Sequence, residues 1–262
     1  MKKDPVLHPR VREIHRDDVL WILDKPPGVL SHPNPPAEDS SSALIRAPYD
    51  SEREVYLVPQ EGGRRRPLHL IHRLDQDTSG IIICSFSPDA AAALKEALYH
   101  REVQKEYRAL VLGIPNPPEG IWADALEKRQ ARGQVHVVVV KGRHNAQTHY
   151  SILKAFPKAG AALLRLWPET GRTHQLRVQA AHRGFPIAGD AHYGDLAANL
   201  RLLDLIGLRR MFLHAYRVEF RHPFTGHRMC FTAEPTKPLA EPLGRLESLQ
   251  ERIRVESRRK RG

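Results

Sequence analysis

Cysteine is scarce in this sequence of 262 residues, which has two, Cys84 and Cys230. They lie far apart and neither belongs to a Cys-x-x-Cys pair, so the sequence predicts neither a disulfide framework nor a thiolate zinc site. We expect both to be small core residues. Long apolar runs are also missing, because none approaches the roughly 18 residues that a membrane helix needs. These absences predict a soluble, cytoplasmic protein in a reducing compartment, without a membrane partner.

Several cofactor and metal motifs are missing as well. The sequence has neither of the glycine-rich loops that cradle the phosphates of ATP or a dinucleotide. It also lacks His-Glu-x-x-His and the His-x-Glu with Pro-Cys-x-x-Cys pattern of zinc deaminases. A metal could be sought among His182, Asp190, His192 and Asp195, but their spacing fits no familiar site. We therefore expect a chemistry that needs no cofactor, no nucleotide and no metal.

Positive charge is what the sequence has in excess. It contains 41 lysines and arginines against 30 acidic residues, a formal net charge of +11. The basic residues are spread along the whole length, which predicts a polyanionic partner. Nucleic acid is favoured over a membrane surface, because no amphipathic basic helix stands out. A merely solvated basic surface is the alternative.

Strand-like runs outnumber helical ones. We expect strands at 19–23, 81–85, 107–112, 135–140, 148–153, 162–167 and 213–220. We expect helices from a Ser87 cap to about Arg101, from a Thr173 cap to about His182, and over 196–206 and 243–254. Strands and helices do not alternate regularly, which favours an α+β fold with a mixed, mostly antiparallel β-sheet and flanking helices. The stretch 31–67, rich in proline, serine and charge, predicts a long surface excursion with at most a short helix at 43–46.

One carboxylate stands in a basic neighbourhood. Asp75 lies within HRLDQDTSG at 72–80, shortly after three consecutive arginines at 64–66. A carboxylate held beside arginine stays ionised, which suits a nucleophile or a base better than a general acid. The alternative is that Asp75 caps a turn against the amides of Thr78 or Ser79.

Six segments of the sequence carry a resemblance to a known family. They are ILDKPPGVLSHP (22–33), HRLDQDTSG (72–80), KEYRALVLG (105–113), QTHYSIL (147–153), PETGRTHQLRVQAAHRGFPIAGDAHYGD (168–195) and LHAYRVEFRHPFTG (213–226). In these segments, which span about residues 14 to 235 in the family's order, the chain resembles the RluA family of RNA pseudouridine synthases. The resemblance implies the pseudouridine synthase fold with a central RNA-binding cleft. It also implies an isomerase, an intramolecular transferase that converts uridine in ribosomal or transfer RNA to pseudouridine.

The resemblance assigns catalytic roles to three residues. Asp75 would be the catalytic carboxylate, which either attacks the sugar or removes a proton from it. Tyr107 would stack on the target base and could help to remove the proton from carbon 5. Arg172 would pair with Asp75 and hold it ionised, and this partner would offset the unfavourable position of a cation at a helix start.

Five further residues are expected to bind RNA. Arg73 would fill the gap that the flipped target nucleotide leaves in its stack. His72 and Thr78 belong to the same segment and are expected to contact the substrate. His174 and Arg177, predicted on one helix face, could face phosphate or be structural.

The expected organisation is a basic N-terminal arm at 1–13, a pseudouridine synthase catalytic domain at 14–235, and a C-terminal helix with a basic tail at 236–262. No N-terminal RNA-binding S4 domain is expected, and we expect a monomer. A catalytically idle RNA-binding protein on the same fold is one alternative. The other is a nucleoside or glycoside hydrolase with Asp75 as nucleophile, which would need a second acidic group that Asp77 is poorly placed to supply.

Overall fold

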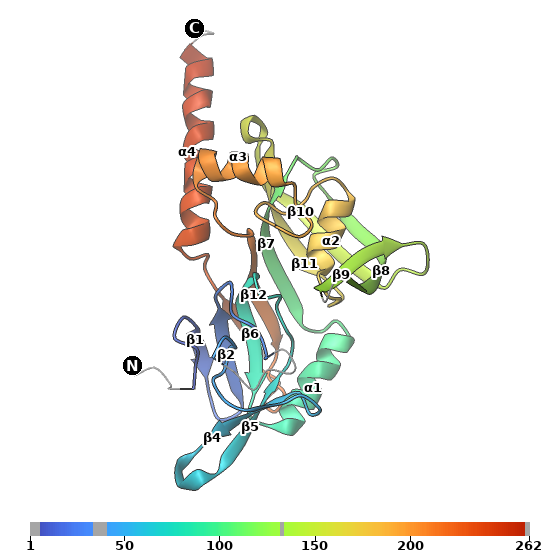
Figure 1. The fold of residues 1–262 in the computed structure, drawn as a ribbon, viewed down its shortest axis with the longest axis vertical. Helices are drawn as coiled ribbons and strands as arrows, with labels where there is room; N and C mark the ends of the chain where they lie inside the picture. Colours follow the sequence, from blue (N-terminus) through green and yellow to red (C-terminus); the bar gives the residue numbers. More distant parts are fainter. Residues whose placement is uncertain (1–5, 34–40, 132–133, 260–262) are drawn as a thin grey trace. The chain divides into compact units, whose positions relative to one another are not determined.

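The structure is a computed structural model that describes residues 6–33, 41–131 and 134–259. The chain divides into two compact units, one formed by Met1–Lys105 with Ala215–Ala233 and the other by Glu106–His214 with Glu234–Gly262 (Figure 1). We describe each unit by itself. Both contain antiparallel strand pairs with helices beside them, so the predicted α+β fold with a mixed, mostly antiparallel sheet is confirmed.

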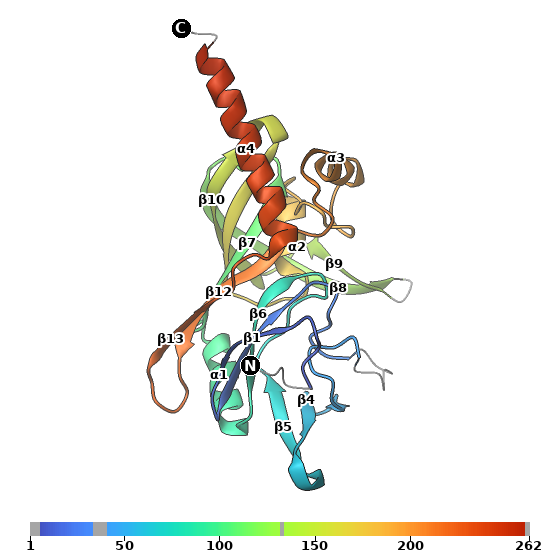
Figure 2. The same ribbon diagram turned by 90° about the vertical axis from the view of Figure 1, so that its left-hand side faces the viewer.

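The first unit is built around strand β6. Its strands are β1 (Arg12–Arg16), β2 (Leu20–Lys25), β3 (Tyr49–Asp50), β4 (Val55–Pro59), β5 (Arg65–Leu70), β6 (Ser79–Ser85), most of β12 (Leu213–Arg221), and β13 (Arg228–Thr232). They run in the order β3-β4-β5-β6-β12, while β2 pairs with β6 and β1 with β2. Strand β13 lies beside β12, with which it pairs (Figure 2). Every residue of β6 is buried. Its continuous apolar run therefore reflects a central strand covered on both faces.

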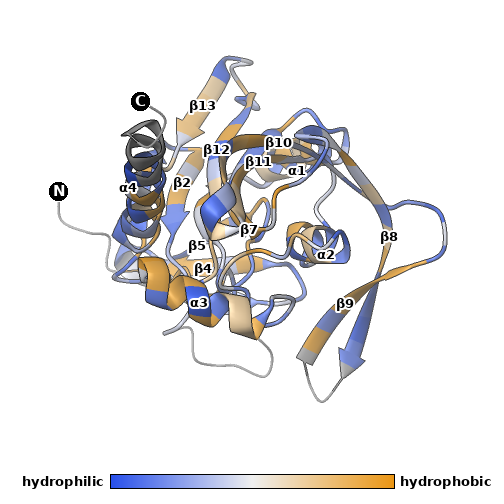
Figure 3. Ribbon diagram, turned by 90° about the horizontal axis from the view of Figure 1, so that it is seen from above, coloured by the Kyte–Doolittle hydropathy of each residue, from blue (hydrophilic) through white to orange (hydrophobic). Residues whose placement is uncertain are grey.

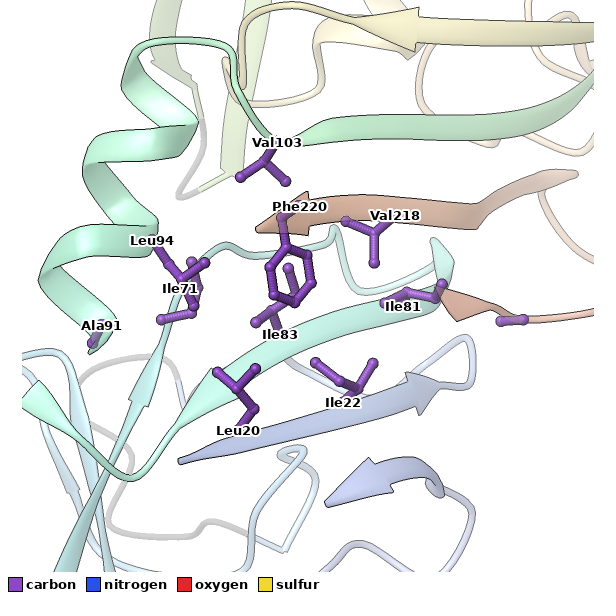
Figure 4. Packing of buried hydrophobic residues seen from close by; sticks show 11 residues of the cluster. Leu20, Ile22, Ile71, Ile81, Ile83, Ala91, Leu94, Val103, Val218 and Phe220 are labelled. Atoms are coloured by element: carbon purple, nitrogen blue, oxygen red, sulfur yellow. The ribbon is translucent and has the colours of Figure 1, made fainter. Parts of the chain in front are cut away.

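Alternate residues of three strands form the core of this unit. Leu20 and Ile22, Ile81 and Ile83, and Val218 and Phe220 are each two residues apart, so each pair points to one face of its strand (Figure 4). Helix α1 (Pro88–Tyr99) covers them with Ala91 and Leu94. The site loop described below leads directly into this core strand.

The second unit has the strand order β7-β11-β10-β8-β9. Its elements are β7 (Gln104–Leu112), which starts in the first unit, β8 (Glu119–Ala131), β9 (Gln134–Val140), β10 (Ala146–Phe156), β11 (Ala161–Pro168), α2 (Gln175–His182), α3 (Leu196–Ile206) and α4 (Lys237–Arg259). One core joins β7 and β11 to α3 and α4 through Leu110, Leu202 and Leu246, among others. A smaller one packs Val178 of α2 against the β8–β9 hairpin, in which β9 is largely hydrophobic (Figure 3).

Most of the predicted elements are confirmed. The Ser87 cap is present, since Ser87 Oγ accepts a hydrogen bond from Ala90 N at 3.2 Å. Helix α3 has the predicted bounds, with Asp195 as its cap and Gly207 in the left-handed region after its end. The predicted C-terminal helix exists but is longer, because α4 begins at Lys237 and Leu239 is already buried in the core.

Three expectations were wrong. Stretch 31–67 contains strands β3 and β4 and the start of β5, and 43–46 is not helical: Ala43 to Ile45 are buried and Leu30 and Ala43 form an isolated bridge. Thr173 does not cap a helix, because α2 begins at Gln175 after His174. Cys230 is exposed on β13, whereas Cys84 is buried as predicted.

The expected division at 1–13, 14–235 and 236–262 stays a prediction, although β1 runs across its first boundary. Two residues of the predicted basic tail, Lys260 and Arg261, lie outside the described residues. Within the described part of the chain, no helix is long and apolar enough to cross a membrane.

Candidate active site

The loop between β5 and β6 carries several of the predicted site residues. His72, Arg73, Asp75 and Thr78 lie on it, all within the first unit. His72 and Asp75 are half-buried, Arg73 is exposed and Thr78 is buried. One short segment thus presents side chains of very different solvent access.

Ser31 binds the backbone of this loop directly before Asp75. The Ser31 hydroxyl donates to Leu74 O at 2.8 Å and accepts from Leu74 N at 3.0 Å. After Asp75 the chain turns, since Thr78 N donates to Asp75 O at 3.1 Å. The backbone on the N-terminal side of Asp75 is therefore fixed by a buried hydroxyl.

Lys25 fixes the loop on the other side of Asp75. The residue is fully buried, and its Nζ donates to Pro26 O at 3.0 Å, Val29 O at 2.7 Å and Gln76 O at 2.8 Å. Gly28 N also donates to Gln76 O, at 2.9 Å. A buried ammonium needs such partners, because an unpaired charge away from water is very unfavourable. The β2 end and the following turn thus hold both neighbours of Asp75.

His72 is a neutral, structural histidine. Its Nε2 accepts a hydrogen bond from Ile83 N at 3.2 Å, which requires an unprotonated ring nitrogen. Burial, and to a smaller extent the charge of Lys105, lower the pKa of His72 to about 3. Burial likewise lowers the pKa of Lys105 to about 8. The geometry therefore favours a role for His72 in joining the loop to β6 over a contact with RNA.

The end of the loop is shaped by close packing. The Thr78 hydroxyl is buried and has no hydrogen-bond partner among the described residues. Gly80 has φ of +113°, and a Cβ there would lie 2.2 Å from Ala215 O. Only glycine fits at that position, and the buried Thr78 side chain favours a structural role.

Tyr107 lies on β7 in the second unit, opposite Leu166 of β11. Its side chain is largely buried, at 9% exposure. The flanking Glu106 and Arg108 point to the other face of the strand and pair with each other at 2.6 Å. The strand thus carries an aromatic ring on one face and an ion pair on the other.

The loop 168–174, which carries Arg172, is organised by the amide of Gln175. Gln175 Nε2 donates to Gln147 O at 3.0 Å and to Thr148 Oγ1 at 2.9 Å. Its Oε1 accepts from Thr170 Oγ1 at 2.7 Å and from Arg172 N at 3.1 Å. Gln175 is buried, so these contacts replace the water that its amide would otherwise bind.

The Arg172 side chain is exposed and contacts a turn. Its Nε donates to Asn145 O at 3.2 Å. The Asn145 side chain is itself fixed, because its Oδ1 accepts from Leu126 N and its Nδ2 donates to Leu126 O. Arg172 precedes the first helical residue, Gln175, so the expected conflict with the helix dipole is weaker than predicted.

His174 and Arg177 do not share a helix face, because His174 precedes α2 in the left-handed region with φ of 52°. His174 Nδ1 lies 2.8 Å from the hydroxyl of Tyr193. Arg177 is buried and bidentate to Asp190, at 2.8 and 2.9 Å. Burial alone would raise the pKa of Asp190, but the hydrogen bonds and charge of Arg177 hold it below its usual range. This geometry favours the structural alternative for Arg177.

The structure thus gathers His72, Arg73, Asp75 and Thr78 on one loop of the first unit. It places Tyr107, Arg172, His174 and Arg177 in the second unit. The predicted pairing of Asp75 with Arg172 joins the two units and stays a prediction. Among the described residues, no group of three or more histidine, cysteine or acidic side chains is arranged to hold a metal ion.

The residues that hold these loops were missed as site residues. Lys25 and Ser31 bind backbone atoms of Gln76 and Leu74, the two neighbours of Asp75. Gln175 accepts a hydrogen bond from the backbone N of Arg172, and Asn145 O accepts one from the Arg172 side chain. Lys25 and Ser31 lie in one of the six resembling segments and Gln175 lies in another, whereas Asn145 lies in none. Those segments were the available signal, but they did not reveal what the residues contact.

Comparison with known proteins connects the chain to one family. Residues 19–182 match the family described as RNA pseudouridylate synthase. Ribosomal large subunit pseudouridine synthase C of Haemophilus ducreyi is 35% identical over 90% of this chain and 69% of that protein. Ribosomal large subunit pseudouridine synthase D of Xanthomonas campestris is 35% identical over 90% of this chain and 68% of that protein. The solved structure of Human RNA Pseudouridylate Synthase Domain Containing 4 superposes with a TM-score of 0.67 at 25% identity, covering 90% of this chain and 92% of that one. This chain spans about two thirds of the length of the two bacterial relatives.

Proposed function

The chain belongs to the RNA pseudouridylate synthase family, and from this membership we propose that it modifies large-subunit ribosomal RNA. As a member it is an isomerase that converts uridine in RNA to pseudouridine. The carbon-nitrogen bond between N1 and the ribose breaks, and a bond from C5 to the ribose forms. The proton of C5 is lost and N1 gains one, so the reaction needs no cofactor.

The observation that carries the choice of substrate is the identity to proteins named as ribosomal large subunit synthases. It is 35% over 90% of this chain for each of two such proteins. The net charge of +11 supports a phosphate-rich partner. Both site loops fall within residues 19–182, the stretch that matches the family.

In the proposed mechanism Asp75 is the carboxylate that acts on the ribose. The contacts of Ser31 and Lys25 support this role, because they fix the backbone on both sides of Asp75. Tyr107 supplies the ring on which the target base stacks. Arg172 supplies the cation that keeps the Asp75 carboxylate ionised.

Arg73 and His174 are the proposed RNA contacts. Arg73 is exposed and lies two residues before Asp75. It fills the gap that the flipped nucleotide leaves in the base stack. His174 lies two residues after Arg172 and faces the phosphate chain. His72, Thr78 and Arg177 support the loops that carry these residues.

Pseudouridine mapping of total RNA tests the proposal. Cells with the gene intact, deleted, or restored as wild type, Asp75→Asn or Asp77→Asn would be compared. We expect deletion to remove a defined site in large-subunit ribosomal RNA, which the Asp77→Asn copy restores and the Asp75→Asn copy does not. Asp77 is the matched control, because it is an acid two residues away on the same loop.

Each outcome is decisive. A site restored by Asp75→Asn would remove Asp75 from the catalytic role. If deletion removed a pseudouridine from transfer RNA and left ribosomal RNA unchanged, the proposed substrate would be wrong and the proposed activity would be confirmed. Purified Asp75→Asn should keep its RNA affinity within about tenfold, because phosphate contacts carry most of the binding.

A further inference from the structure

Arg73 is exposed, yet its guanidinium has a defined neighbour. The Arg73 Nη1 lies 2.7 Å from His32 Nε2, and the two residues are 41 positions apart in sequence. From this contact we propose that His32 is a positioning residue, whose neutral imidazole aims the Arg73 guanidinium for its insertion into the RNA. The inference rests on the role given to Arg73 in the proposed function.

The hydrogen bonds of the ring fix its protonation state. His32 Nδ1 lies 2.9 Å from Pro33 O. A carbonyl oxygen can only accept, so Nδ1 must carry the proton. In the neutral ring Nε2 then has a lone pair, and a guanidinium can only donate. Each atom of the Arg73–His32 contact therefore has one possible role.

Two tyrosines support the His32 ring, one by direct stacking and the other by packing against the first. His32 stacks on Tyr49 with ring centroids 5.3 Å apart and an interplanar angle of 14°. Tyr49 packs against Tyr56 at 4.8 Å. The fully buried Tyr56 donates from its hydroxyl to Ser31 O at 2.8 Å, next to His32 in the chain. The His32 imidazole is therefore packed against Tyr49, which in turn is packed against the buried, hydrogen-bonded Tyr56.

The backbones of the two segments are held together as well. Ser31 binds both backbone groups of Leu74, while the next residue, His32, contacts the one before it, Arg73. Two neighbouring residues of one segment thus meet two neighbouring residues of the other. The Arg73 contact is therefore built on a fixed backbone.

A positioned arginine makes nucleotide flipping easier. An unrestrained arginine loses rotamer freedom when it fills a gap in a base stack, whereas one already aimed loses less. Phosphate contacts, which dominate affinity, do not depend on this aiming. Loss of the His32 contact should therefore lower the rate at which the bound RNA is converted and leave RNA affinity nearly unchanged.

Two substitutions of His32 test separately its hydrogen-bond acceptor and its aromatic ring. His32→Phe keeps a flat ring for Tyr49 but has no acceptor, whereas His32→Gln keeps an acceptor for Arg73 without the aromatic ring. The readout is single-turnover tritium release from a large-subunit ribosomal RNA transcript labelled as [5-³H]uridine, because the C5 proton is lost in the reaction. We expect His32→Phe to slow release by about 3- to 10-fold. His32→Gln should stay within about twofold of wild type in rate, and both variants within about twofold in affinity for the transcript.

The double variant Arg73→Ala/His32→Phe distinguishes positioning from general support. Since His32 acts through Arg73, His32→Phe should have no further effect once Arg73 is alanine. A wild-type rate for His32→Phe, or additive losses in the double variant, would overturn the inference. If His32→Phe does not fold, the following measurement decides it.

Nitrogen NMR of ¹⁵N-histidine-labelled protein at neutral pH gives a readout independent of turnover. The His32 signals, assigned by their loss in His32→Gln, should report a proton on Nδ1. A proton on Nε2 would sink the inference, because Arg73 would then face a donor. If the wild-type protein releases no tritium, the proposed substrate is wrong, and the position of this proton alone decides the role of His32.

Discussion

The two site loops are held by different chemistry. In the first unit, the ammonium of Lys25 and the hydroxyl of Ser31 bind the backbone around Asp75. In the second unit, the neutral amide of Gln175 links the backbone of Arg172 to Thr170 and β10. An ammonium can only donate, whereas an amide both donates and accepts. The first loop therefore depends on a few charge-assisted bonds, and the second on a network of weaker ones.

Removing the Lys25 amine should give the larger loss of stability. Lys25→Met keeps the unbranched stem but removes the ammonium donor from the carbonyls of Pro26, Val29 and Gln76, of which Gln76 O keeps the Gly28 amide as a donor. We expect the free energy of unfolding to fall by about 2 to 4 kcal/mol, since three carbonyls, among them the buried Val29 O, would lose charge-assisted bonds. Urea unfolding measures it, with the exposed Lys158→Met as the matched control. A loss no greater than that of the control would contradict the first half of the comparison.

Removing the Gln175 amide should have a smaller effect. Gln175→Leu keeps most of the volume, and the network can partly rearrange because Thr148 and Thr170 can rotate their hydroxyls. We expect a loss of about 1 to 3 kcal/mol in urea unfolding. The exposed Gln130→Leu is the control. If the loss exceeded that of Lys25→Met, the ranking of the two loops would be reversed.

Acid should act on the first loop through His72. The folded pKa of about 3 lies below the ordinary value of 6.5, so the unfolded chain takes up the proton first. The stability linked to neutral His72 is therefore present above pH 6.5 and lost as the pH falls toward 3. His72→Gln keeps an acceptor for Ile83 N but cannot titrate. Between these two pH values, the unfolding free energy of the variant should depend less on pH than that of wild type. The two slopes should differ by up to about 1.4 kcal/mol per pH unit. Parallel curves for variant and wild type would show that His72 is not the source.

Local signals in the sequence identified much of the fold. The Ser87 cap with Pro88 predicted the start of α1, because caps act on neighbouring residues. Helix α3 was predicted over 196–206 without its caps, and the structure adds Asp195 and Gly207 at its two ends. Strands β3 to β5 were missed because they are short and rich in proline and charge. Their pairing comes from contacts between segments, which no local pattern reveals.

The site was predictable as a set of residues but not as a set of contacts. The segment 72–80 was recognised from its sequence, yet Ser31 and Leu74 are 43 residues apart and nothing local links them. Arg177 was left open between phosphate binding and structure, because its sequence does not reveal the buried partner Asp190. In both cases the role of the residue depends on a contact with a residue that is distant in the sequence.

Gly80 has a consequence for how the protein is made. It lies against Ala215 of β12, the strand beside β6, and the part of β12 in the first unit is synthesised only after the whole segment Glu106–His214. The first unit is therefore assembled from two pieces of chain that leave the ribosome at different times. The segment with Asp75 emerges early, but its neighbouring strand arrives late, and such distant pairings are slow to form. We therefore expect competence to modify RNA only after β12 has been synthesised, because a nascent chain that stops before β12 carries the carboxylate without the finished sheet around it.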